Sequence, residues 1–92
     1  MKIKLKDGFV LRQIADTWVV MAIGETMMDF NGMITLNETG MFLWKAVGEG
    51  EELSALVSSL MMEYNVAKEQ AEADVKEFCD KLVEIGCAEY IA

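Results

Sequence analysis

The chain has 92 residues, 53% of them hydrophobic, a length that allows one domain and excludes two. Its net charge is −8, and residues 49–92 account for the excess because they carry eleven acidic and three basic side chains. A surface of this sign repels a nucleic-acid backbone, and no segment approaches the ~20 apolar residues that a membrane span requires, so neither nucleic acid nor membrane is an expected partner.

The first half of the chain has the patterns of three short strands. Residues 9–14 alternate loosely between apolar and polar side chains, and residues 18–23 are apolar throughout. Because only a short turn joins them, these two strands should pair antiparallel. The pair Asn31-Gly32 is typical of a tight hairpin turn, and the apolar, partly β-branched segment Met33–Leu36 after it predicts the third strand.

The second half has the patterns of three helices. Asn37 is a suitable N-cap for the first, over 38–47, because its side-chain oxygen can accept a hydrogen bond from an unpaired backbone N–H of the first turn. The second, over about 51–64, starts with acidic residues that complement its N-terminal dipole, and Asn65 after it can adopt a left-handed C-cap. The third covers 68–85 and ends at Gly86.

This order of elements predicts the fold class. We expect an α+β, winged helix-turn-helix-like fold over residues 1–92, with a three-stranded antiparallel meander followed by three helices. Residues 88–91 either add a short terminal strand or simply pack. Gly40 lies in the first turn of the first helix, where it costs roughly 1 kcal/mol relative to alanine, so we expect a close backbone contact there.

The sequence lacks the residues of the common catalytic and metal sites. It has no histidine, and its cysteines, Cys79 and Cys87, lack the CxxC spacing of a zinc site. If one helix carried both, they would lie about 12 Å apart, too far for a disulfide. The basic start of the chain also lacks the apolar run of a signal peptide. We therefore expect idle thiols in the cytoplasm, no metal, no cofactor and no enzyme.

The charged residues of the third helix predict a solvated face. Its carboxylates are interleaved with lysines, and Glu72–Lys76 and Glu77–Lys81 have the spacing of i,i+4 ion pairs. The methionines around the third strand allow two interpretations. They either fill the core or form an adaptable apolar surface that binds varied segments.

Two segments of the chain resemble the PqqD-like family. They are Leu36-Asn37-Glu38-Thr39-Gly40 with Phe42-Leu43-Trp44, and Tyr64 … Asp74-Val75-x-x-Phe78 … Leu82 … Gly86. The resemblance extends over residues 8–91. It departs from the family pattern at Cys79, where an aliphatic residue is more usual, and at Cys87-Ala88, where bulkier aliphatic residues are usual.

The resemblance implies a recognition element for ribosomally made, post-translationally modified peptides (RiPPs), as in pyrroloquinoline quinone (PQQ) biosynthesis. Such domains are not catalytic. They bind the leader region of a precursor peptide and present it to a modifying enzyme, often a radical S-adenosylmethionine (SAM) protein. The implied mode is addition of the leader as a further strand beside the third strand, whose outer N–H and C=O groups are unpaired in a three-strand meander.

The expected peptide-binding residues come from two elements. Those of the strand edge are Met33, Ile34, Thr35 and Leu36. Those of a groove wall on the third helix are Ala71, Val75, Phe78 and Leu82, with Asp74 and Glu77 beside them to pair with basic leader residues. The core remains an equal alternative for Val75, Phe78 and Leu82.

Two other classes of function fit the same elements. One is a winged-helix nucleic-acid-binding or transcription-associated protein, which the net charge disfavours. The other is a scaffold domain that associates with itself, in which exposed strand edges pair to form a homodimer.

Overall fold

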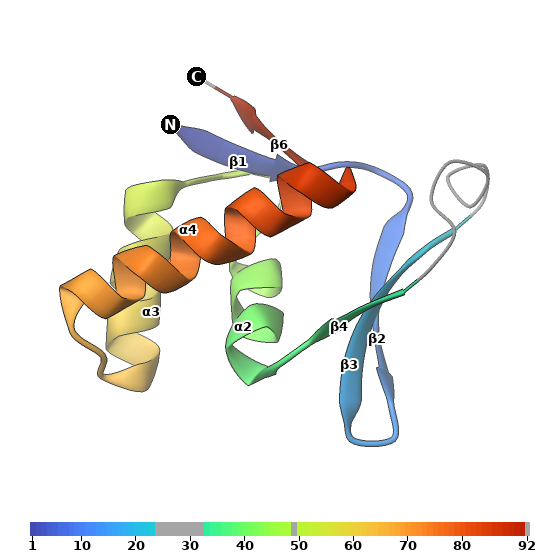
Figure 1. The fold of residues 1–92 in the computed structure, drawn as a ribbon, viewed down its shortest axis with the longest axis horizontal. Coiled ribbons are helices and arrows are strands. Elements are labelled where there is room, and N and C mark those ends of the chain that lie inside the picture. The colour runs from blue at the N-terminus through green and yellow to red at the C-terminus, as the bar shows by residue number, and fades with distance from the viewer. Residues whose placement is uncertain (24–32, 49, 92) are drawn as a thin grey trace.

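The computed structural model describes residues 1–23, 33–48 and 50–91. Its elements, in chain order, are β1 (Lys2–Leu5), β2 (Phe9–Ile14), β3 (Thr17–Ala22), β4 (Met33–Leu36), α2 (Glu38–Val47), β5 (Glu51–Glu52), α3 (Leu53–Tyr64), α4 (Lys68–Ile85) and β6 (Ala88–Ile91). The strands form two antiparallel sheets, β2-β3-β4 and β5-β1-β6. In Figure 1 the first sheet stands at the right, the helices lie to its left, and β1 and β6 lie above them.

The predicted meander and helices are present. β2, β4, α2 and α4 have the predicted bounds, and β3 lies one residue earlier than predicted. The shift arises because Thr17 pairs with Ile14, which leaves a turn of only two residues, and the first of them, Ala15, has a φ of +56°. The predicted Asn31-Gly32 turn lies outside the described residues.

The β5-β1-β6 sheet is a feature that the prediction lacks. β1 alternates lysine with apolar residues, as a strand with one buried face does, and Ile3 is fully buried. Its partners, β5 and β6, are distant in sequence. Residues 88–91 therefore form a strand, the first of the two expected outcomes.

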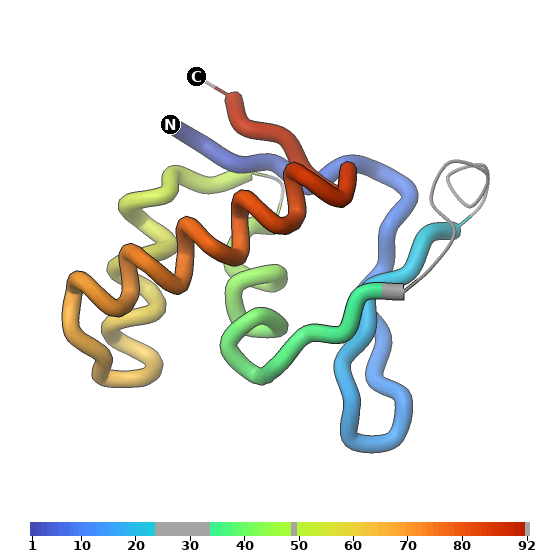
Figure 2. Tube along the Cα trace, in the orientation of Figure 1, coloured from blue at the N-terminus to red at the C-terminus, as the bar shows by residue number. Residues whose placement is uncertain are grey.

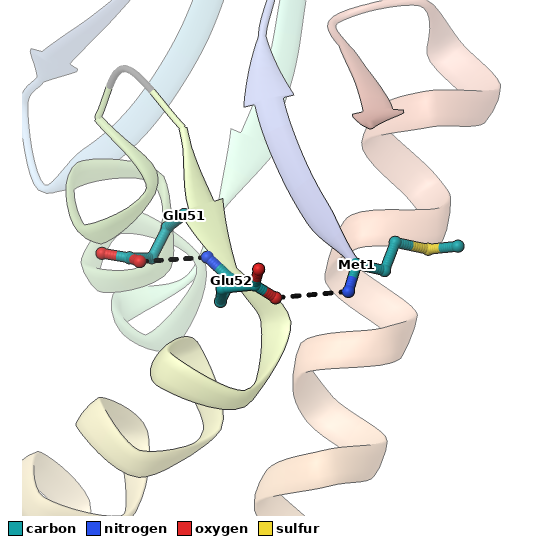
Figure 3. A network of polar contacts seen from close by, with 3 residues as sticks. All are labelled: Met1, Glu51 and Glu52. Carbon is teal, nitrogen blue, oxygen red and sulfur yellow. Dashed lines mark hydrogen bonds and ion pairs between the residues drawn. The ribbon is translucent and has the colours of Figure 1, made fainter. Parts of the chain in front are cut away.

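The start of the second helix differs from the prediction. Glu51 and Glu52 belong to β5, and α3 begins at Leu53. The Glu52 carboxylate lies 3.2 Å from the Met1 amino group, while the Glu52 backbone N–H donates to the Glu51 carboxylate at 3.0 Å (Figure 3). Glu52 makes no side-chain cap on α3, and the Met1 amino group is the partner of its carboxylate.

One core joins both sheets to the helices. Ile3 of β1, Val20 of β3, Leu43 of α2, Leu60 of α3 and Val75 of α4 all belong to it, and each is at most 2% exposed. Burial of these side chains is the main force that holds the β2-β3-β4 sheet against the helices. Among the described residues, no helix has the length and hydropathy of a membrane span.

The two helix ends that the sequence marks are confirmed. Asn65 ends α3 in the left-handed conformation, with its N–H donating to the Met61 carbonyl at 2.9 Å. Gly86 ends α4 at a φ of +100° and donates to the Leu82 carbonyl at 3.0 Å. These left-handed residues satisfy carbonyls that a helix leaves unpaired at its last turn.

Both cysteines are buried and free, as expected. Burial raises the pKa of the Cys79 thiol to about 11, and it raises the pKa of the Cys87 thiol to about 11 as well. Both thiols are therefore protonated at neutral pH, the unreactive form of cysteine.

Candidate peptide-binding site

β4 is the edge strand of its sheet, and it leads directly into α2 (Figure 2). One side of β4 pairs with β3. Its other side has no partner strand among the described residues. An edge of this kind presents unpaired backbone N–H and C=O groups to any extended chain that approaches it.

The hydrogen-bond pattern of β3 decides which backbone groups of β4 face outward. Just beyond the β2–β3 ladder, the Ile23 N–H donates to the Gly8 carbonyl at 2.8 Å, so these two residues form a hydrogen-bonded pair. Such pairs alternate with non-hydrogen-bonded pairs along antiparallel strands. In the observed register, the odd-numbered residues of β3 therefore bond to β2, and the even-numbered ones direct their backbone groups toward β4.

This alternation assigns the outward groups of β4. Ile34 and Leu36 are the register partners of Val20 and Trp18, so their backbone groups bond to β3. The N–H and C=O of Thr35 therefore face the open edge, as do those of Met33.

The side chains of β4 divide between its two faces. Ile34 and Leu36 are 7% and 8% exposed and pack into the core, whereas Thr35 is exposed on the opposite face. An added strand would thus find its hydrogen-bond partners at Thr35 and its apolar neighbours at Ile34 and Leu36. The predicted edge residues thus lie on one strand, where Thr35 offers backbone hydrogen bonds and its neighbours Ile34 and Leu36 offer apolar contacts.

A pocket of about 240 Å³ lies beside this edge. It is enclosed by the end of β4, the start of α2 and the middle of α4. Its lining residues are Thr35, Leu36, Asn37, Thr39, Gly40, Leu43, Asp74, Glu77, Phe78 and Lys81. The pocket therefore joins the two elements from which the sequence predicts peptide binding.

The corner between β4 and α2 forms one end of the pocket. Asn37 Oδ1 accepts a hydrogen bond from the Gly40 N–H at 2.7 Å, which confirms the predicted N-cap. A Cβ on Gly40 would lie 3.2 Å from that oxygen and 3.4 Å from Leu36 Cβ, so the expected close contact is present. Lys45 Nζ also lies 4.8 Å from the centre of the Trp18 ring, a cation–π contact that ties α2 to β3.

The predicted residues of α4 fall into two groups. Ala71, Val75 and Leu82 are at most 2% exposed and belong to the core, because they lie on the stripe of α4 that faces the other helices. Phe78 and Asp74 are half-buried and line the pocket. The core alternative thus describes Val75 and Leu82, whereas Phe78 contacts the core and also faces the pocket.

The ion pairs of α4 differ from those predicted. Lys76 Nζ donates to Asp80 Oδ2 at 2.6 Å, and the Tyr90 hydroxyl donates to the other oxygen of the same carboxylate. Hydrogen bonds from Lys76 and Tyr90 hold the pKa of Asp80 below its usual value. Asp80 lies at i+4 from Lys76, and the Tyr90 hydroxyl connects the same carboxylate to β6. The predicted pairs Glu72–Lys76 and Glu77–Lys81 are therefore not among the ion pairs of the described residues.

The pocket includes residues that the sequence does not place in a peptide site. Asn37 and Gly40 have structural roles in the sequence interpretation, and they also line the pocket. Lys81 lies seven residues after Asp74, and this i,i+7 spacing would have placed both on one face of α4. Thr39 and Leu43 carry no comparable signal, because only the turn of the chain at Asn37 brings them to the pocket.

Comparison with known proteins gives two matches. The family model of coenzyme PQQ synthesis protein D (PqqD) matches residues 17–87, which contain β3, β4 and the helices α2, α3 and α4. The solved structure of TbiB1 in complex with the TbiA(beta) leader peptide is similar to this chain with a TM-score of 0.77 and 25% sequence identity, covering 97% of this chain and 98% of that one. No curated protein sequence gives a significant match.

Proposed function

The chain belongs to the PqqD family, and from this we propose that it binds the leader region of a ribosomally made precursor peptide and presents it to a modifying enzyme. The domain itself is not catalytic. Its partner enzyme is a radical SAM protein of a PQQ-like or other RiPP pathway. The observation that carries this proposal is the open edge of β4 beside a pocket that α4 completes.

The leader binds as a fourth strand of the β2-β3-β4 sheet. Main-chain hydrogen bonds to the Thr35 N–H and C=O give affinity that does not depend on the leader sequence. Cross-strand neighbours share a face of the sheet, so leader residues opposite Ile34 and Leu36 direct their side chains toward the core face and the pocket. Alternate leader residues therefore contact the pocket, and their side chains determine specificity.

Two further observations support this function. TbiB1, whose fold this chain shares over nearly its full length, has a leader peptide as its partner in the solved complex. The corner at Asn37 is fixed by the cap to Gly40, and the sheet is tied to α2 by Lys45 and Trp18. A site that is already formed loses less conformational entropy when the peptide binds.

The non-catalytic role has support from the thiols. Cys79 and Cys87 are the strongest nucleophiles of the sequence, and both are fully buried with a pKa of about 11. A protonated thiol inside the core cannot attack a peptide.

A titration followed by NMR tests the proposal. The protein, labelled with ¹⁵N, is mixed with synthetic leader peptides of the precursors encoded near its gene. We expect the largest amide shifts in β4 and along α4, and slower hydrogen exchange of the Thr35 amide in the complex. Shifts restricted to β1, β5 and β6 would overturn the proposed binding mode.

A further inference from the structure

We propose that the charges of α4 set the direction in which a peptide binds in the groove between β4 and α4, which includes the pocket. The groove selects an extended peptide whose side chains toward α4 are basic, apolar and acidic, in that order from its N-terminus. This inference rests on the proposed function and adds to it the chemical class of peptide that binds and the direction in which it lies.

The first observation is the order of charges on one wall of the pocket. Asp74, Glu77 and Lys81 all line it, with the ring of Phe78 among them. At a rise of about 1.5 Å per residue, Lys81 lies roughly 10 Å along the helix axis from Asp74. The wall is therefore acidic at one end, apolar in the middle and basic at the other end.

The second observation is that these charges remain available for a ligand. Glu77 and Lys81 are exposed, and neither belongs to an ion pair of the described residues. The nearby cation Lys76 bonds to Asp80, and neither of these two residues lines the pocket. Asp74 accepts a hydrogen bond at 2.8 Å from the amide of Gln70, a side chain that carries no charge.

The spacing suits an extended chain. Residues of a strand rise about 3.4 Å each, and every second one points to the same face, so the first and fifth residues of a peptide lie roughly 14 Å apart. Lysine and glutamate side chains are long enough to adjust this distance to the roughly 10 Å between Asp74 and Lys81. A basic residue, an apolar residue and an acidic residue at i, i+2 and i+4 therefore match the wall.

The arrangement of the elements sets the direction. In Figure 1, β4 runs from right to left into α2, whereas α4 runs from left to right above it. A strand added antiparallel to β4 thus runs in the same direction as α4 and meets Asp74 before Lys81. Antiparallel addition continues the pairing of this sheet, and parallel pairing is slightly less stable.

Two synthetic heptapeptides of equal composition test the proposal. One is Thr-Lys-Thr-Val-Thr-Glu-Thr, and the other exchanges its lysine and glutamate. Both have blocked ends, so they differ only in the order of the charges. We expect the wild-type protein to bind the first roughly fivefold more tightly in NMR titrations, as two partly exposed ion pairs would give. The preference should disappear in 1 M salt, where the screening length is about 3 Å.

A charge exchange on the protein identifies the residues responsible. The double variant Glu77→Lys/Lys81→Glu should lose the preference or invert it. The matched variant Lys68→Glu/Glu72→Lys also exchanges a lysine and a glutamate four residues apart, at exposed positions of α4 outside the pocket, and should keep the preference. An equal affinity of the wild-type protein for the two peptides would overturn the inferred direction and leave the proposed function intact.

Two other outcomes are distinguishable. If neither these heptapeptides nor the leader peptides bind, the proposed function fails, and the inferred direction fails with it. If sedimentation shows a dimer that peptide does not dissociate, a second copy of the chain occupies the β4 edge, and both proposals are overturned.

Discussion

The side chain of Asn37 accepts a hydrogen bond from the backbone N–H of Gly40 at 2.7 Å, at the point where β4 becomes α2. Both residues of this bond line the pocket, as do Thr35 and Leu36 of the open edge. A Cβ at position 40 would crowd the capping oxygen of Asn37, so the effects of substitutions at these two residues on stability should be coupled.

The coupling predicts non-additive effects on stability. Replacement Asn37→Ala removes the cap and should lower the free energy of unfolding by about 1 kcal/mol. In the wild-type protein, Gly40→Ala should bring little gain, because the new Cβ would crowd the capping oxygen at 3.2 Å. In the Asn37→Ala background the same change should stabilise by up to ~1 kcal/mol, the intrinsic helix preference of alanine. Denaturant titrations of the four proteins measure this coupling, and strictly additive effects would contradict it.

The backbone alternation of β4 predicts opposite effects of proline at neighbouring positions. Thr35→Pro removes an N–H that faces the open edge, so the fold should persist while leader affinity falls roughly tenfold, the value of a strong main-chain hydrogen bond. Ile34→Pro removes an N–H that bonds to β3 and should destabilise the fold by roughly 1–3 kcal/mol, the cost of leaving a buried hydrogen-bond acceptor without its donor. Thr35→Ala, which keeps the N–H, serves as the control in both thermal melts and peptide titrations. A fold that is equally damaged by both prolines would show that the assigned alternation is wrong.

The β2–β3 turn offers a stabilising substitution. Ala15 has a φ of +56°, a conformation that costs a non-glycine residue about 1 kcal/mol. Ala15→Gly should therefore raise the melting temperature by a few degrees. Ala15→Val, a β-branched residue at the same backbone conformation, should lower it. Peptide affinity should be unchanged in both variants, because Ala15 neither lines the pocket nor belongs to β4.

The buried thiols predict a loss of stability at alkaline pH. In the unfolded chain a solvated thiol has its ordinary pKa of 9.0, whereas in the folded protein the pKa of Cys79 is about 11. The stabilisation is fully present below pH 9 and is lost as the pH rises to 11, because only the unfolded chain gains the thiolate there. Stability curves at several pH values should show this decline.

A cysteine-free variant separates the contribution of the thiols to the alkaline loss of stability from that of the tyrosines. Tyr64 and Tyr90 also have pKa values raised by burial, so they contribute to the alkaline decline. The variant Cys79→Ala/Cys87→Ala should therefore decline less steeply between pH 9 and 11 than the wild-type protein. A slope identical to that of the wild-type protein would contradict the assigned role of the thiols.

The sequence alone determined the features that depend on neighbours along the chain. Asn37 caps α2, and Asn65 and Gly86 end their helices, because a cap or a left-handed residue acts within one turn. The apolar periodicity likewise placed the meander and the three helices, and the pattern around Asn37 carried the family resemblance. Each of these signals needs only the local backbone to have an effect.

The tertiary structure decided what depends on distant partners. Glu51 and Glu52 have no strand pattern, and only β1, some fifty residues earlier, makes them a strand. Lys76 had carboxylates four residues away on both sides along the helix, and in the structure it bonds to Asp80, the one that Tyr90 of β6 also contacts.

The same holds for the candidate site. Val75 and Phe78 share one apolar stripe in the sequence, and only the packing of α4 separates the core residue from the pocket residue. The outward groups of Thr35 follow from the pairing of β3 with β2, two strands away from the site. Periodicity shows that a residue is apolar and faces inward, whereas its neighbour across the fold depends on how the whole chain packs.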